Sequence, residues 1–273
     1  MKARAELVAA AGPDGRVRLP VLRSEAPLIL RRTAEAVYLA SGAAGPLGGD
    51  TLELRIEVRA GAALRLRTVA AAVALPGRYG QESRLTVTAT VGAGARLEYL
   101  PEPTVAADGA RHRTDVSVRL AADAALVLRD EVLLGRHGER GGACRTRLAV
   151  DRDGGRGRRP LLRHELDVSG TDPASLGPAV LAGHRAAGTL LTVDPDGTHE
   201  PAGTGGGVTF SEFSEAGAEG NAAAGGQRWV AVMPLAGPGV LVTALAHDTR
   251  TLRRRLEGGG ARRTPVLSGA GGG

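Results

Sequence analysis

The chain has 273 residues, of which 42% are hydrophobic and 2% aromatic, and its formal net charge is +6. This length and apolar content suffice for one β domain with a core of valine, leucine, isoleucine and alanine. The arginines are interleaved with acidic residues, and aromatic side chains that could stack on bases are scarce, so we predict no binding to nucleic acid. Cys144 is the only cysteine, which excludes an internal disulfide and is typical of a reducing compartment.

The amino-terminal residues 1–11 carry Lys2, Arg4 and Glu6 but lack the continuous apolar run of a signal peptide. The longest uncharged stretch, residues 230–246, is interrupted by prolines and glycines, so we expect two short buried strands with a turn there and no membrane span. These features predict a cytoplasmic protein that does not enter a membrane.

Three stretches of the first half repeat one pattern, which is a strand-like run, a turn of small residues and a second strand-like run. They are residues 51–69, 83–103 and 113–132. In each run apolar and polar residues alternate, which places the apolar side chains on one face of a strand. The turn centres are Gly61, Gly94 and Asp123. The pattern predicts a mainly β, layered and helicoid stack of hairpin-like units.

The second half contains weaker signals of the same kind. Residues 147–150 and 161–168 alternate around a loop rich in glycine and arginine, and residues 185–193 form a further expected strand. Short helices are expected within 172–181 and from Asp248 to about residue 257, where Asp248 can cap the helix. We therefore predict one β domain over residues 1–257, with about two short helices, and a disordered glycine-rich tail over residues 258–273.

Motifs for catalysis are missing from the sequence. The six histidines are dispersed, no serine stands in a G-x-S-x-G frame, and the glycines of 203–207 lack the lysine that follows in a phosphate-binding loop. Asp130 and Glu131 are adjacent carboxylates, but neighbouring strand residues face opposite sides, so the two cannot share a site. We predict that the protein has no catalytic residues and no permanently bound cofactor.

Four short motifs, in order and over nearly the whole chain, resemble the urease accessory proteins of the UreD (UreH) family. They are Gly48-Gly49-Asp50 before the first long strand, LEYLPEP at 97–103, Ala110-Arg111, and Glu131 followed by Gly135-Arg136. Two features depart from the usual family pattern. Residues 67–69 lack the glutamine of the family segment, and Asp130 replaces an aromatic residue before the glutamate.

The resemblance implies a nonenzymatic scaffold that joins a UreF-type protein and the GTPase UreG to apo-urease, so that nickel in transit reaches the urease active site. It also implies an internal polar path for the metal, lined by residues on strand faces turned toward the interior. The candidates for this path are Glu98, Glu102 and Glu131, with Arg136 beside them. Oxygen ligands suit transit because they release the ion more readily than thiolates and imidazoles do.

A second set of motif residues consists of candidates for partner contacts or for a structural role: Asp50, Pro101, Pro103, Arg111, Gly135 and Arg136. An equally weighted interpretation is that Asp50, Arg136 and the three glutamates cap turns or pair with surface arginines. Two other classes of protein also fit part of the sequence. A β-helical carbohydrate-active protein would explain the stacked strands and carboxylates, and a basic β-sheet adaptor for acidic partners would explain the positive charge.

Overall fold

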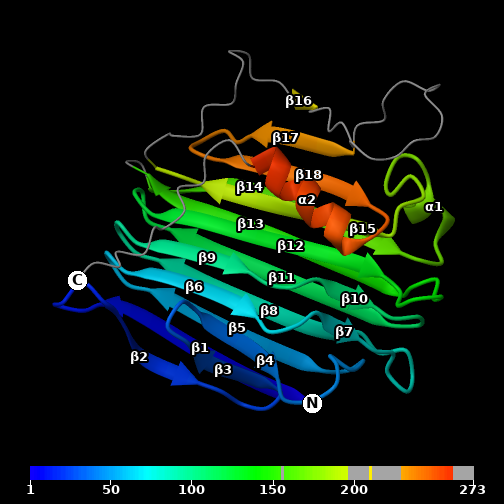
Figure 1. Ribbon diagram of the computed structural model, residues 1–273, viewed down its shortest axis with the longest axis horizontal. Coiled ribbons are helices and arrows are strands. Elements are labelled where there is room, and N and C mark those ends of the chain that lie inside the picture. Colours follow the sequence, from blue (N-terminus) through cyan, green and yellow to red (C-terminus); the bar gives the residue numbers. More distant parts are fainter. Residues whose placement is uncertain (155–156, 196–208, 211–228, 261–273) are drawn as a thin grey trace.

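The computed structural model describes residues 1–154, 157–195, 209–210 and 229–260. Within these ranges the chain forms two β-sheets that pack face to face, together with two helices (Figure 1). The predicted fold class, a mainly β layered stack with two short helices, is confirmed.

The seven-stranded sheet is parallel in its interior and antiparallel at both edges. Its strands, in spatial order, are β14 (Gly157–Ser169), β13 (Ala143–Gly154), β11 (Arg111–Leu120), β8 (Ser83–Val91), β5 (Thr51–Val58), β1 (Lys2–Ala11) and β2 (Val17–Arg23).

The eleven-stranded sheet covers one face of the first sheet. Its main path, in spatial order, is β16 (Thr209–Phe210), β17 (Val230–Pro234), β18 (Val240–Ala246), β15 (Ala186–Val193), β12 (Ala125–Leu134), β9 (Arg96–Leu100), β6 (Ala63–Thr68), β4 (Val37–Ser41) and β3 (Leu28–Arg32). Two short strands lie off this path: β10 (Thr104–Ala106) pairs with β12, and β7 (Ala72–Ala74) pairs with β10.

The repeated units are arches and not hairpins, which corrects the expected pairing within each unit. The first arms, β5, β8 and β11, lie side by side in the seven-stranded sheet, and the second arms, β6, β9 and β12, lie in the other sheet. Each turn therefore carries the chain from one sheet to the other; the turn glycines Gly61 and Gly94 have φ values of +70° and +61°. The arch buries the apolar faces of both arms against each other, as fully buried Leu54 and Leu66 illustrate.

The predicted elements of the second half are present. β13 and β14 form an antiparallel hairpin, helix α1 (Pro173–Leu176) begins after the capping residue Asp172, and β17 and β18 pair as two short strands. The glycines of 203–207 lie outside the described residues. None of the helices in the described ranges has the length and apolar character needed to cross a membrane.

Helix α2 (Thr249–Gly260) packs on the outer face of the eleven-stranded sheet, over β18 and β15 (Figure 1). The Asp248 carboxylate accepts a hydrogen bond of 2.8 Å from the backbone N–H of Thr251, and Leu252 and Leu256 are fully buried against the sheet. The helix continues to Gly260, so the tail predicted from residue 258 starts too early; residues 261–273 lie outside the described ranges.

Candidate functional site

Glu98 lies on the outer face of the eleven-stranded sheet. Its neighbours Leu97 and Tyr99 belong to the core between the sheets, so the alternation of β9 directs Glu98 the other way. Its carboxylate accepts a hydrogen bond of 3.0 Å from Nε of Arg65 and lies 3.6 Å from Nε of Arg96. The expectation that Glu98 faces the interior is therefore wrong. The alternative interpretation, in which this glutamate pairs with arginine, agrees with the structure.

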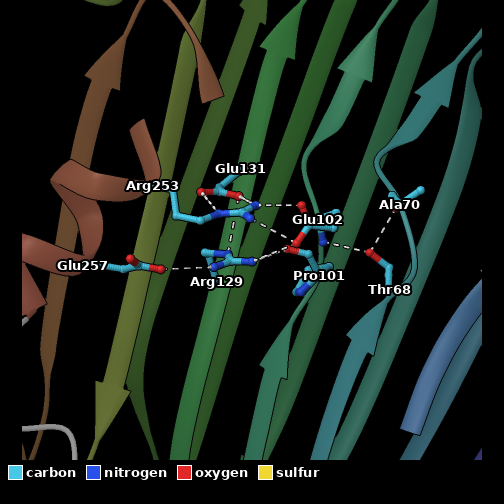
Figure 2. A network of polar contacts seen from close by, with 8 residues as sticks. All are labelled: Thr68, Ala70, Pro101, Glu102, Arg129, Glu131, Arg253 and Glu257. Atoms are coloured by element: carbon cyan, nitrogen blue, oxygen red, sulfur yellow. Dashed lines mark hydrogen bonds and ion pairs between the residues drawn. The ribbon is translucent and has the colours of Figure 1, made fainter. Parts of the chain in front are cut away.

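Glu102 and Glu131 are brought together by an arginine from helix α2 (Figure 2). Arg253 donates hydrogen bonds of 3.1 and 3.0 Å to the two carboxylate oxygens of Glu102 and one of 2.6 Å to Glu131. The Glu131 side chain is fully buried, and Nε of Arg129 lies 3.4 Å from its carboxylate. Burial alone would lower the pKa of Arg253, but the hydrogen bonds to Glu131 and Glu102 outweigh it and raise that pKa.

This network fills an irregular stretch of the sheet, where β9 and β10 do not join into one strand. β12 pairs with β9 as far as Leu128 and with β10 from Val132 onward, which leaves residues 129–131 without a strand partner on that side. Pro101 and Pro103 lie in the connecting segment and lack the N–H that a ladder requires. The carbonyl of Pro101 accepts a hydrogen bond of 3.0 Å from Arg129 (Figure 2). Both prolines thus have a structural role. They lie where residues 129–131 lack a strand partner, between β9 and β10, and we call this interruption of the sheet the gap.

The remaining motif residues lie elsewhere and do not join this network. Asp50 shapes a turn, because its carboxylate accepts a hydrogen bond of 2.9 Å from the backbone N–H of Leu47. Arg136 is exposed and pairs with Glu139 in the same loop, where Gly135 adopts a φ of +73°. Arg111 is exposed at the start of β11.

A row of polar side chains crosses the interior between the sheets. On the eleven-stranded sheet, Asp130 is directly opposite Thr189, and Thr189 is directly opposite Thr243; on the other sheet, Thr114 is directly opposite Thr146. Residues opposite each other on neighbouring strands share a face, so each row runs across its sheet. We call these five residues, Asp130, Thr189, Thr243, Thr114 and Thr146, the polar seam.

The polar seam separates two parts of the apolar core. Along β12 the inward positions are Leu126 and Leu128 in one buried cluster and Val132 and Leu134 in another, with Asp130 between them. Burial raises the pKa of both Tyr99 and Cys144, and the charge of Asp130 raises each further, which places this carboxylate close to both. The prediction that Asp130 and Glu131 face opposite sides is confirmed. Because Asp130 faces the space between the sheets, Glu131 lies on the outer face under helix α2, and the expectation that Glu131 faces the interior is wrong.

Asp130 also borders two cavities. One, of about 260 Å³, is lined by Tyr99, His112 and Thr114 in the interior and reaches Glu102 and Glu131 at the gap. The other, of about 300 Å³, is lined by Thr146, Thr189 and Thr243 of the seam and by His164. Asp130 is the seam residue that lines both cavities. Among the described residues, no group of three or more His, Cys, Asp or Glu side chains could hold a metal ion.

Burial raises the pKa of Asp130 from 3.8 to about 6; a hydrogen bond from Thr146 opposes this shift and the charge of Glu131 adds to it. The folded state therefore holds the proton of the Asp130 carboxyl more tightly than the unfolded state does. The contribution of this proton to the free energy of unfolding is complete below about pH 4 and is lost as the pH rises to about 6. We expect Asp130→Asn to gain unfolding free energy relative to the wild type over this window, by roughly 1.4 kcal/mol per pH unit. Chemical denaturation of both proteins at several pH values measures the difference; parallel curves would contradict the burial of this charge.

Sequence reasoning missed most of the polar seam and Arg253. A signal for Asp130 was available, because it is the polar residue in an otherwise apolar set of alternate positions on β12. Thr189 and Thr243 gave no comparable signal, since threonine is common in strands and their alignment with Asp130 depends on strand register.

The fold and the seam define a class of protein: a two-sheet β stack of parallel arches, with a row of polar side chains between the sheets and a helix packed on its outer face. The family model described as UreD urease accessory protein matches residues 1–269. The chain is 44% identical to the urease accessory protein UreD of Frankia alni, over 94% of this chain and 91% of the relative. It is also 44% identical to the urease accessory protein UreD 3 of Streptomyces griseus, over 94% and 95% of the two chains. The chain belongs to the UreD family of urease accessory proteins.

Proposed function

We propose that the protein is a nonenzymatic urease maturation factor that joins a UreF-type protein and a UreG-type GTPase to apo-urease and lets nickel pass through its interior. Family membership supports the role in urease maturation. The observation that supports passage of the metal is the position of Asp130, a half-buried carboxylate that borders both cavities. Glu102 and Glu131 line the first of these cavities, so they remain candidates for contact with the metal at its gap side.

The chemistry of the seam fits a cargo that must be released. One carboxylate and four hydroxyl groups offer oxygen ligands, which hold nickel less tightly than thiolates and imidazoles do. Nickel is the substrate of this transfer, and we propose no permanently bound cofactor. GTP hydrolysis belongs to the UreG-type partner in this proposal. We place the reaction in the cytoplasm, in keeping with the single free thiol of Cys144.

Co-purification tests the scaffold role. The full chain is tagged and expressed with UreF-type and UreG-type proteins and the urease subunits, in the presence of nickel and GTP, and is then recovered through its tag. We expect all partners to be recovered with the chain and to be absent when an unrelated tagged β protein is used. Recovery of this chain alone, soluble and monomeric, would contradict the proposed assembly.

A further inference from the structure

Two histidines and a tryptophan pack together where three strands of the eleven-stranded sheet end and helix α2 begins. His184 lies just before β15, His247 directly after β18 and Trp229 directly before β17. The ring centroids of His184 and His247 are 4.4 Å apart in a stacked arrangement, and the ring of Trp229 meets that of His184 in a T-shaped arrangement at 4.2 Å. We call these three residues the histidine stack. It connects three strand ends at the start of α2.

His184 is the buried histidine of the stack, at 3% exposure, whereas His247 is exposed. Nδ1 of His184 donates a hydrogen bond of 3.0 Å to the carbonyl oxygen of Leu181, because a carbonyl can only accept. The neutral imidazole therefore carries its proton on Nδ1, and a second proton would enter at Nε2. That proton would place a positive charge in a buried position beside a second imidazole, which is costly.

Two neighbouring groups add to this cost. His247 at the end of β18 and Arg255 of α2 each lower the pKa of His184 through their charge, and burial lowers that pKa most. Asp248 follows His247 in the chain, but its carboxylate accepts hydrogen bonds from the backbone N–H and the hydroxyl of Thr251. The pKa of His184 thus lies below its ordinary value of 6.5, and the folded chain favours the neutral ring.

The histidine stack also lies at the point where α2 is attached. Asp248, directly after His247, caps the helix, so the ring of His247 cannot move far without moving the cap. Farther along the helix, Arg253 pairs with Glu102 and Glu131 at the gap (Figure 2). A change at the stack can therefore affect how the helix covers the gap.

We propose that the histidine stack is a pH-sensitive latch for helix α2: neutral rings hold the start of the helix on the sheet, and protonation of His184 separates the rings and loosens the helix. Because the attached state favours neutral His184, the attachment is complete above the ordinary histidine pKa of about 6.5 and weakens as the pH falls below it. Loosening withdraws Arg253 from Glu131. The latch depends only on residues of this chain and does not rest on the proposed function.

Hydrogen exchange of the full chain, resolved by peptide and corrected for the chemical exchange rate, tests the latch at about pH 7.5 and about pH 5.5. We expect exchange of α2 in the wild type to rise by about tenfold at the lower pH, because His184 titrates near its ordinary pKa once the helix is loose. Exchange of β5 is the internal reference. It is needed because burial also lowers the pKa values of His112 and His164 in the seven-stranded sheet.

Three variants separate the stack from other titrating groups. His184→Asn keeps a donor for the carbonyl of Leu181 but cannot be protonated, so the rise in α2 exchange should be lost. His247→Gln leaves the buried ring in place and removes the neighbouring charge, so it should reduce the rise. His137→Asn is the matched control, because His137 is exposed in another loop and its loss should leave the rise unchanged.

Three results would overturn the proposal: no rise in the wild type, equal rises in α2 and β5, or a rise that persists in His184→Asn. If His184→Asn does not fold, His247→Gln decides, and an undiminished rise in that variant contradicts the latch. The measurement needs neither urease nor partners. Failure of the latch therefore leaves co-purification unaffected, and failure of the assembly leaves the exchange of α2 unaffected.

Discussion

Replacing Glu131 by alanine is expected to lower the free energy of unfolding by about 3–5 kcal/mol, the cost of breaking a buried ion pair from one side. The Glu131 carboxylate is fully buried. Its Oε2 lies 2.6 Å from Nη2 of Arg253 and 3.4 Å from Nε of Arg129. Its removal leaves two guanidinium groups close together, and Arg129 is only 7% exposed. Helix α2 would also lose one of the contacts that hold it to the sheet.

Urea unfolding of Glu131→Ala and Glu98→Ala measures this effect against a matched control. Glu98 also pairs with an arginine on the outer face of the same sheet, and Arg65 is about as exposed as Arg253, at 29% and 28% of the side chain. The Glu98 side chain is also largely buried, at 11% exposure, but its pair connects neighbouring strands and holds no helix, so we expect its loss to cost less, about 2 kcal/mol. An equal decrease in the free energy of unfolding for the two variants would contradict the prediction. It would show that Glu131 is not needed to compensate the charges of Arg253 and Arg129.

Urease activation should fall by roughly 10- to 100-fold when Asp130 is replaced by asparagine, a loss of the size that follows from disturbing the ligand environment of a metal. The variant removes the charge at the junction of the two cavities while the surrounding packing stays the same. Because burial raises the pKa of Asp130 to about 6, the same variant should be more stable than the wild type near pH 7. Activation and stability are thus expected to change in opposite directions.

Activation is measured as urease activity and nickel content after co-expression with the UreF-type and UreG-type proteins. Asp115→Asn provides the control, because this carboxylate lies on the outer face of β11, paired with Arg113, away from both interior cavities. Both variants should still co-purify with the partners. Full activation by Asp130→Asn within an assembled complex would exclude Asp130 from the path of the metal.

The layered β fold was predictable from the alternation of apolar and polar residues in the sequence. Leu54 and Leu66 belong to runs with a period of two, and the turn around Gly61 predicts the change of direction between them. The sequence does not distinguish a hairpin from an arch, because both bury one face of each arm and both use small turn residues. Pairing with strands from neighbouring units decides between them, and that choice is a property of the whole stack.

The candidate site was predictable only where one strand carries the signal. Opposite faces for Asp130 and Glu131 follow from local geometry, but the inward face of β12 was not assigned to Asp130. Arg253 meets Glu131 across 122 residues, and Thr189 meets Asp130 through strand register. Contacts of this kind depend on how α2 and β15 dock on β12, which local periodicity does not determine.

Nickel transfer to purified apo-urease tests the central proposal most directly. Apo-urease, the UreF-type and UreG-type proteins, nickel and GTP are combined with and without this chain, and the nickel bound per urease active site is measured after removal of free metal. Our account predicts that nickel content and urease activity rise together only when the chain is present. Equal nickel content and activity in its absence would contradict the role of the protein in delivering the metal.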